Sequence, residues 1–216
     1  MSIDSLSLQE LHEDAELIPL MTAEDEDEMD RAELPEILPI LPLRNTVLFP
    51  GVVVPITAGR DKSIKLIHET NKGNKTIGVV SQKDENEEEP GLSDINAVGT
   101  VAKILRVLKM PDGNTTVIIQ GQKRFEVAEM ITTEPYMTAT VRPVEEARPA
   151  KENEEFNEII ASIKELSLRI IKDSPNIPSE AAFAIKNIES NSFLINFVSS
   201  NLNISVSEKQ AILEIN

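Results

Sequence analysis

Few residues in this sequence have the type and spacing that catalysis requires. Ser63 lies close to Lys62 and Lys65, so the chemistry to consider is a serine nucleophile with a lysine base. A lysine acts as a base only when its amine is desolvated. The polar residues around Ser63 predict a solvated helix start, where both lysines stay charged. We therefore expect no catalytic nucleophile.

Phosphate and metal sites are also incomplete. Gly73-Asn74-Lys75 lacks the upstream glycine and the preceding strand of a phosphate-binding loop, so no ATP site is predicted. With only His12 and His68 and no cysteine, the sequence predicts neither a metal site nor a disulfide. The lack of cysteine, of a signal peptide and of a long apolar run favours a cytoplasmic location without a membrane partner.

Negative charge is concentrated at the N-terminus. The formal net charge is −16, and 13 of the 37 acidic residues lie within residues 1–36, where Arg31 is the single basic residue. Such a segment buries too little apolar surface to offset its chain entropy. Residues 1–36 are therefore predicted to form a disordered acidic tail that keeps the chain soluble, with docking of a basic partner as the alternative.

Residues 37–148 have the pattern of a small β domain. Prolines at positions 39, 42, 50 and 55 exclude a helix interior and favour edge strands and bends. A short helix is predicted to start near Asp61, and the loop at residues 83–91, which has no apolar residue, is expected to be solvated and without function. Further strands are predicted at residues 76–80, 98–109, 115–120, 124–131 and 136–144. About six strands and one helix predict a small, partly open barrel.

Residues 149–216 change to a helical period. Apolar residues spaced by three and four from Phe156 to Ile171 predict a helix that ends before Ser174-Pro175. Two further helices are expected near residues 179 and 192, and Ser205 with Glu208 forms a capping box that starts a fourth. The fold class is therefore predicted as α+β, with a β domain followed by a helical bundle.

Several segments carry a resemblance to a known family. Residues 37–62 (ILPILPLRNTVLFPGVVVPITAGRDK), 78–84, 98–125 and 187–215 resemble, in this order, blocks of the N-terminal domain of Lon proteases. Asp61 stands where the family more often has Glu, which keeps the charge. The resemblance covers about 180 residues and leaves only the acidic segment outside it.

The resemblance implies a barrel related to the PUA fold, followed by a helical subdomain that leads to an ATPase module and a Ser-Lys peptidase. Neither module lies in this sequence, so the fragment is expected to have no catalytic residue, metal or cofactor, while ATP and magnesium would bind elsewhere in the parent enzyme. The implied function is recruitment of unfolded, misfolded or degron-bearing proteins to a protease that assembles as a homohexamer.

The predicted substrate-binding surface combines exposed apolar residues, a charged helix start and an open strand edge, where an extended peptide could add as a strand. Its residues are Phe49, Pro50, Arg60, Asp61, Lys62, Lys65, Met110 and Pro111. The alternative interpretation makes Phe49 a core residue and the charged helix an ordinary solvated face. One copy should bind with a dissociation constant of about 10 μM to 1 mM, which several copies would strengthen through avidity.

Two other functions stay open at this point. A stand-alone adaptor or receptor with a Lon domain is one of them. The other is an RNA-binding module, whose basic residues would be Lys103, Arg106, Lys109, Lys123 and Arg124. The small excess of negative charge after residue 36, the absence of Trp and the single Tyr argue against RNA, which needs a basic face and aromatic platforms.

Overall fold

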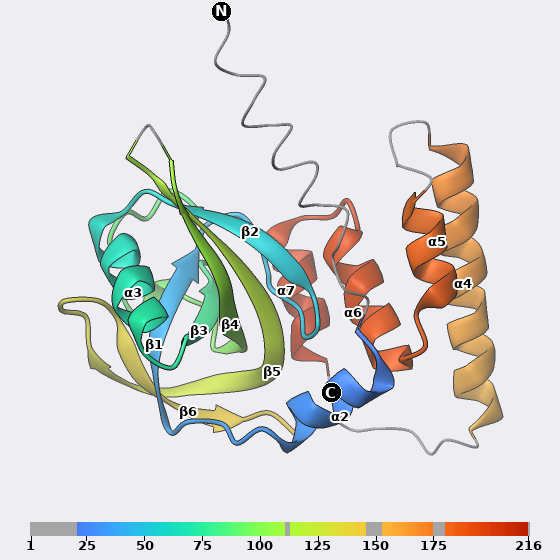
Figure 1. Cartoon of the computed structure of the whole chain (residues 1–216), viewed down its shortest axis with the longest axis horizontal. Helices are drawn as coiled ribbons and strands as arrows, with labels where there is room; N and C mark the ends of the chain where they lie inside the picture. Colours follow the sequence, from blue (N-terminus) through green and yellow to red (C-terminus); the bar gives the residue numbers. More distant parts are fainter. Residues whose placement is uncertain (1–20, 111–112, 146–152, 175–179, 216) are drawn as a thin grey trace, which may run out of the picture.

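The structure is a computed structural model of the chain and describes residues 21–110, 113–145, 153–174 and 180–215. They form an α+β fold in which a β barrel lies beside a group of helices, as predicted (Figure 1). The elements are α2 (Ala23–Arg31), β1 (Ile37–Leu43), β2 (Val53–Ala58), α3 (Asp61–Lys72), β3 (Thr76–Ser81), a short 3-10 helix (Leu92–Asp94), β4 (Val98–Lys109), β5 (Thr115–Thr132), β6 (Thr138–Pro143), α4 (Glu154–Asp173), α5 (Glu180–Asn187), α6 (Asn191–Asn201) and α7 (Val206–Glu214).

The six described strands form one sheet that curls into a partly open barrel. The strand order is β2-β5-β4-β3-β1-β6, and β6 pairs back onto β5, so five strands close a ring and β2 lies on its margin. Strands β1 and β3 run parallel, whereas the other pairs are antiparallel. The predicted barrel of about six strands is therefore confirmed.

Strand β5 is long enough to serve two walls of the barrel. Its first half pairs with β2 and β4, and its second half pairs with β6. A Cβ atom on Gly121, in the middle of the strand, would lie 2.2 Å from the carbonyl oxygen of Phe49, so only glycine allows this close approach. The two strands predicted at residues 115–120 and 124–131 are thus a single strand.

The prolines of β1 are not at a sheet edge, which corrects the prediction. The strand lies between β3 and β6. The amide of Ile40 donates to the carbonyl oxygen of Met137, which lies just before β6. Because backbone groups of successive residues alternate between the two sides of a strand, the nitrogen of Pro42 also points to the β6 side, and the nitrogen of Pro39 points to the β3 side. Pro42 lies past the last pair with β6, and Pro39 lies before the first pair with β3. Neither proline therefore removes a ladder hydrogen bond.

Helix α3 packs across β1, which precedes it in the chain, and across β3 and β4, which follow it. Its face carrying Leu66 and Ile67 is fully buried against aliphatic residues of the barrel, including Leu41, Ile77 and Ile104. These side chains remove apolar area from water without any buried aromatic ring in the cluster. The start of the helix is thereby fixed close to the end of β2.

The helical region shares a core with the barrel. Phe49 and Val52, from the segment between β1 and β2, pack in one cluster with Ile188, Phe193 and Leu213 of the helical region. Polar contacts reinforce this junction, because the guanidinium of Arg124 on β5 donates to the carbonyl oxygens of Leu213 and Ile215 at 2.8 and 2.6 Å. The two parts are therefore packed together along a buried boundary.

The segment before β1 is ordered from residue 21 onward, contrary to the predicted disorder of residues 1–36. Thr22 and Asp25 form a capping box at the start of α2. Met21 is only 6% exposed and packs in the core shared by the barrel and the helices. Lys123 of β5 donates to the carbonyl oxygen of Ala32. Capping and local apolar burial thus outweigh the acidic composition, while residues 1–20 lie outside the described residues.

Candidate peptide-binding groove

A groove follows the seam of the barrel, where β2 faces β1 without pairing to it. Its volume is about 1070 Å³. One wall is the length of β2, and the opposite wall is the end of β1 with the segment that follows it. The residues that line it are Leu41, Pro42, Leu43, Arg44, Asn45, Thr46, Val54, Pro55, Ile56, Thr57, Ala58, Gly59, Arg60, Ser63, Glu85, Asn86 and Glu88.

Strand β2 turns an unpaired backbone edge toward this groove. Among the described strands it pairs only with β5. The carbonyl oxygen of Val52 accepts from Gly121 of β5, so alternation directs the polar backbone groups of residues 54, 56 and 58 to β5. Those of Pro55 and Thr57, which line the groove, then face it. In the described part of the chain, one amide and two carbonyls are therefore available there to an added strand.

Prolines on both walls explain why the seam does not close. The nitrogen of Pro42 faces the side of β1 that β6 leaves unpaired, and that of Pro55 faces away from β5. Both residues line the groove. Each wall therefore lacks a donor at the point where a direct β1–β2 ladder would form. The edge-strand prediction for Pro55 is confirmed.

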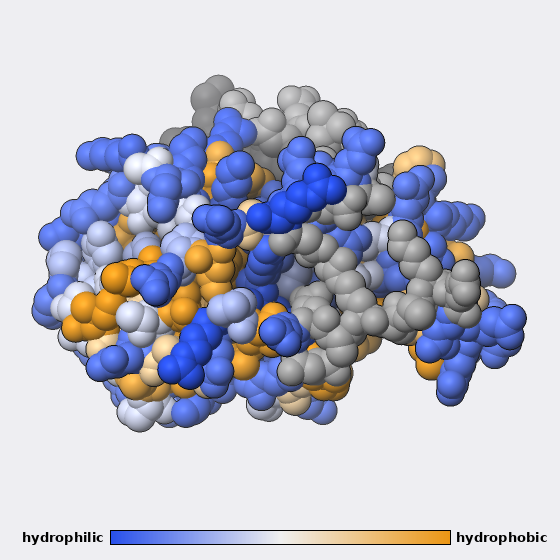
Figure 2. All heavy atoms as spheres, turned by 90° about the horizontal axis from the view of Figure 1, so that it is seen from below, coloured by the Kyte–Doolittle hydropathy of each residue, from blue (hydrophilic) through white to orange (hydrophobic). Residues whose placement is uncertain are grey.

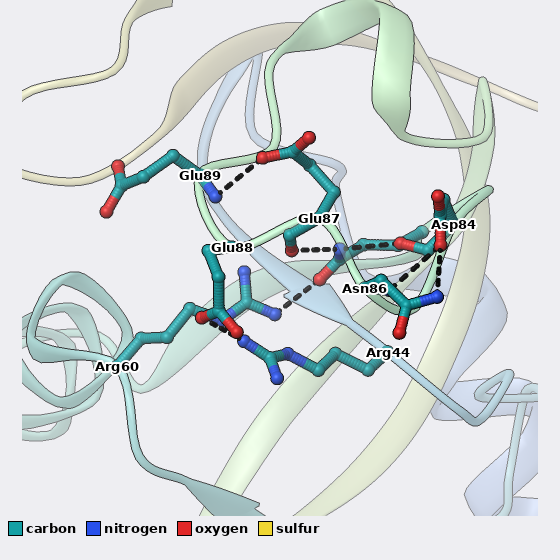
Figure 3. Close-up of polar contacts among 8 residues, drawn as sticks. Arg44, Arg60, Asp84, Asn86, Glu87, Glu88 and Glu89 are labelled. Carbon is teal, nitrogen blue, oxygen red and sulfur yellow. Dashed lines mark hydrogen bonds and ion pairs between the residues drawn. The ribbon is translucent and has the colours of Figure 1, made fainter.

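The loop at residues 83–91 forms the rim of the groove and is held in place, although its composition predicted a solvated segment without function. Gln82, which is only 2% exposed, donates from Nε2 to the carbonyl oxygens of Asp84 and Glu87 at 3.1 and 2.9 Å. Arg44 donates from Nη2 to Oε2 of Glu88 at 2.5 Å (Figure 3). The rim therefore has a defined shape.

Arg60 reaches the same rim from the N-terminal end of α3. Its guanidinium donates to Oε1 of Gln82, a neutral partner. Burial lowers the pKa of Arg60 below its usual value, the charge of Arg44 acts in the same direction, and Glu88 and Glu89 oppose them. An arginine stays charged despite such a shift. A cation that is partly withdrawn from water therefore lies beside the groove.

Lys62 ties the rim to the neighbouring hairpin. Its Nζ lies 2.8 Å from Oε1 of Glu134 and 2.7 Å from Oε2 of Glu89. The hydrogen bond to Glu134 and then that to Glu89 raise the pKa of Lys62. Because a raised pKa keeps the amine protonated, Lys62 cannot act as the base for the nearby Ser63. The ion pairs of Lys62 therefore argue against nucleophilic chemistry at Ser63.

The predicted surface residues are only partly brought together. Arg60 and Lys62 line a small hollow of about 150 Å³ between α3 and the segment before β6, which adjoins the groove. Asp61 and Lys65 are exposed on α3 but line neither the groove nor this hollow. Met110 is half-buried at the β4–β5 hairpin.

Phe49 and Pro50 are corrections to the predicted surface. Phe49 is 1% exposed in the core between barrel and helices, and Pro50 is also buried. Both lie in the segment that the helical region covers, so a substrate does not reach Phe49 in this structure. Pro111 lies outside the described residues.

Sequence reasoning missed the residues that shape the groove. Arg44, Gln82 and Glu88 were not among the predicted site residues, and they meet only through the fold. The available signal was Pro55 within an apolar strand, because a proline there indicates an unpaired edge.

Apolar side chains are also exposed elsewhere on the barrel. Seen from below, hydrophobic residues gather over the barrel, at the left (Figure 2). Ile37 on β1 and Ile131 on β5 are 52% and 50% exposed. They lie on strands that flank β6. Such exposed apolar surface is typical of protein-binding sites.

The basic residues proposed for RNA binding do not form one free face. Arg124 is buried and holds the C-terminal end of α7. Lys123 holds the segment after α2. In the described ranges no cluster of His, Cys, Asp or Glu is placed to hold a metal ion, and none of the helices described there is long and apolar enough to span a bilayer.

The fold and groove together define a class of protein: an α+β domain whose barrel leaves one strand edge unpaired beside an open groove. The family model for the ATP-dependent protease La (LON) substrate-binding domain matches residues 37–216. The chain belongs to this family. The matched domain is a substrate-binding domain and not a catalytic one, whereas full-length Lon is a protease.

Curated relatives and solved structures agree with this assignment. The Lon protease of Flavobacterium johnsoniae is 67% identical over all of this chain and 26% of its own length, and that of Cytophaga hutchinsonii is 51% identical over 94% of this chain and 25% of its own. The chain thus spans about a quarter of these relatives. The N-terminal domain of a Mycobacterium avium complex Lon protease has a TM-score of 0.67 with 21% identity over 83% of this chain and 90% of its own, which shows a shared fold.

Proposed function

We propose that this chain recruits protein substrates to a Lon protease by binding an extended segment of an unfolded or degron-bearing protein as an added strand on β2. The unpaired edge of β2, which lines an open groove, is the observation that carries the proposal. Unfolded proteins expose backbone donors and acceptors that folded proteins satisfy internally, so this edge favours them.

The groove also offers an apolar contact for the side chains of such a segment. Val54 and Ile56 of β2 are partly buried on the barrel core and line the groove together with Leu41 and Leu43. Backbone pairing with apolar contact requires no particular sequence, which suits a recruiter of many substrates. A shallow site of this kind binds weakly, with a dissociation constant of about 10 μM to 1 mM.

The proposal extends to the assembled enzyme. A homohexamer would bring several grooves near one entrance, and the resulting effective concentration would raise the apparent affinity. ATP and magnesium would bind the ATPase module of the parent enzyme and not this region. We place the chain in the cytoplasm, where newly made and misfolded proteins occur.

Site-directed crosslinking tests the proposed function directly. The chain has no cysteine, so one introduced thiol can carry a photo-crosslinker without background. Thr57→Cys places it on the groove edge, and Lys65→Cys places it on the exposed face of α3 outside the groove. Reduced, carboxymethylated α-lactalbumin, which stays unfolded, serves as the probe.

We expect crosslinks to the unfolded probe from position 57 to exceed those from position 65 by about fivefold or more, because only position 57 contacts an added strand. Folded α-lactalbumin should give little product from either position. Equal yields from the two positions would rule out β2 as the docking edge.

A further inference from the structure

Two arginines with side chains from opposite ends of the groove meet at its rim. Strands β1 and β2 run antiparallel, so Arg44 after β1 and Arg60 after β2 start from opposite ends. Their guanidinium groups nevertheless reach toward each other beside the loop at residues 83–91 (Figure 3). Like charges repel at short range, so this pair requires nearby negative charge.

Glu88 supplies that charge from within the chain. It lies between the two arginines and pairs with Arg44 (Figure 3). The side chains of Arg44 and Glu88 are 38% and 73% exposed, and exposed pairs of this kind contribute little and exchange readily. Arg60, in contrast, is held by the neutral Gln82 and has no direct carboxylate partner within the described ranges. The arginine pair is therefore arranged around one carboxylate that is easily replaced.

We propose that Arg44 and Arg60 bind the side-chain carboxylate of an Asp or Glu residue in the segment added to β2, and that Glu88 occupies this position while the groove is empty. This inference rests on the proposed function and adds a substrate preference to it. The preferred segments carry an acidic residue between apolar ones.

The position of the arginines favours a side chain over a chain terminus. Arg44 and Arg60 start from opposite ends of the groove and their guanidinium groups reach toward each other (Figure 3), so the site that they form lies between those ends. A bound strand places alternate side chains on opposite faces. Apolar side chains can then contact Val54 and Ile56 while an acidic one between them reaches the two arginines, which bind carboxylates with directional hydrogen bonds.

Peptide binding to the full 216-residue chain tests this inference. The probes are two fluorescein-labelled peptides of alternating Val and Thr with blocked ends, which differ only in a central Glu or Gln. We expect the Glu peptide to bind about five- to tenfold more tightly at about 50 mM salt, and this ratio to fall toward one at about 500 mM. Fluorescence anisotropy gives both dissociation constants.

Variants of the chain assign the effect to the arginines. Arg44→Gln should reduce the preference for the Glu peptide over the Gln peptide to less than about twofold. Arg60→Lys should also reduce this preference, although the variant keeps the positive charge that the fold accommodates. Glu88→Gln should tighten the Glu peptide by about two- to threefold, because the internal competitor loses its charge. Lys65→Gln, which removes a positive charge outside the groove, is the matched control and should leave the preference unchanged.

The outcomes separate this inference from the function on which it rests. Equal affinity for the Glu and Gln peptides, or an unchanged preference in Arg44→Gln, overturns the arginine site but leaves strand addition intact. Failure of both peptides to bind at about 1 mM contradicts the proposed function and the inference with it. A Gln peptide with a free C-terminal carboxylate that binds as tightly as the blocked Glu peptide overturns the assignment to a side chain.

Discussion

Ser81 Oγ donates a hydrogen bond to Oε1 of Gln210 at 2.7 Å, which joins β3 of the barrel to α7 of the helical region. Both side chains are buried. Gln210 also donates from Nε2 to the carbonyl oxygen of Val98 at 2.9 Å. A single amide thus satisfies two groups of the barrel at the boundary between the two regions.

Loss of this amide should destabilise the whole chain. We expect Gln210→Ala to lower the free energy of unfolding by about 1–3 kcal/mol, because in a buried site the Ser81 hydroxyl loses its acceptor and keeps only the bond that it accepts from Asn96, and the Val98 carbonyl loses the Gln210 donor. Urea unfolding measures the change. In a double-mutant cycle with Ser81→Ala, a coupling of about 1 kcal/mol is expected, and strictly additive effects would contradict the shared hydrogen bond.

The ordered segment before β1 gives a second prediction. Met21→Ala should lower the free energy of unfolding by about 2 kcal/mol, because it removes a buried side chain from the shared core. Hydrogen exchange of the α2 amides should become faster. Glu24→Ala, at an exposed position of the same helix, is the control. If both variants behave alike, the segment is the solvated tail that its composition predicts.

The role of Pro55 can be tested through self-association. Pro55→Val restores an amide donor on the groove-facing edge of β2, so we expect this variant to dimerise or aggregate at concentrations where the parent chain does not. Sedimentation velocity measures this. Thr57→Val adds apolar surface to the same edge without a new donor, so it should behave like the parent chain. Equal association of both variants would assign the effect to hydrophobicity instead.

The capping box of α7 predicts a pH dependence of stability. Hydrogen bonds from the hydroxyl and then the amide of Ser205 lower the pKa of Glu208 below its ordinary value of 4.5. A carboxyl group with a lower pKa in the folded state stabilises the fold above its unfolded pKa, and this contribution disappears as the pH falls through the folded pKa. Glu208→Gln should therefore be less stable than the parent chain near neutral pH.

This difference should shrink once the pH falls below about 4.5 and vanish at still lower pH. Urea unfolding between about pH 7 and about pH 3 checks this expectation. Glu189→Gln, which removes an exposed carboxylate outside the helices, controls for the general loss of one negative charge. A stability difference that stays constant over the whole range would contradict the capping interaction.

Local patterns predicted most of the elements. The alternation in residues 98–109 and the turn with Gly113, which has a φ of 90°, gave the β4–β5 hairpin correctly. The Ser205 capping box marked the start of α7. These signals depend on neighbouring residues, so they can be read without the fold. The prediction that residues 21–36 are disordered was wrong. Composition alone does not show that Met21 is buried by residues distant in the sequence.

The candidate site was less accessible to sequence reasoning. Arg60 and Lys62 were expected in a binding surface and do lie beside the groove and its adjoining hollow, whereas Phe49 is buried because the helical region packs over it. Arg44 and Glu88 are 44 residues apart and meet only because β1 and β3 run side by side. No local pattern reports such a pair.

By itself, the sequence determined the aliphatic strands, the amphipathic helices, their caps and the places where proline prevents pairing, since these follow from the period and chemistry of adjacent residues. Only the tertiary structure decided that Pro42 and Pro55 face each other across one open seam, and that two arginines and an acidic loop form its rim. The strand order and the closure of the barrel depend on contacts between residues that are distant in the sequence. They are set by which apolar faces pack together and not by any one segment.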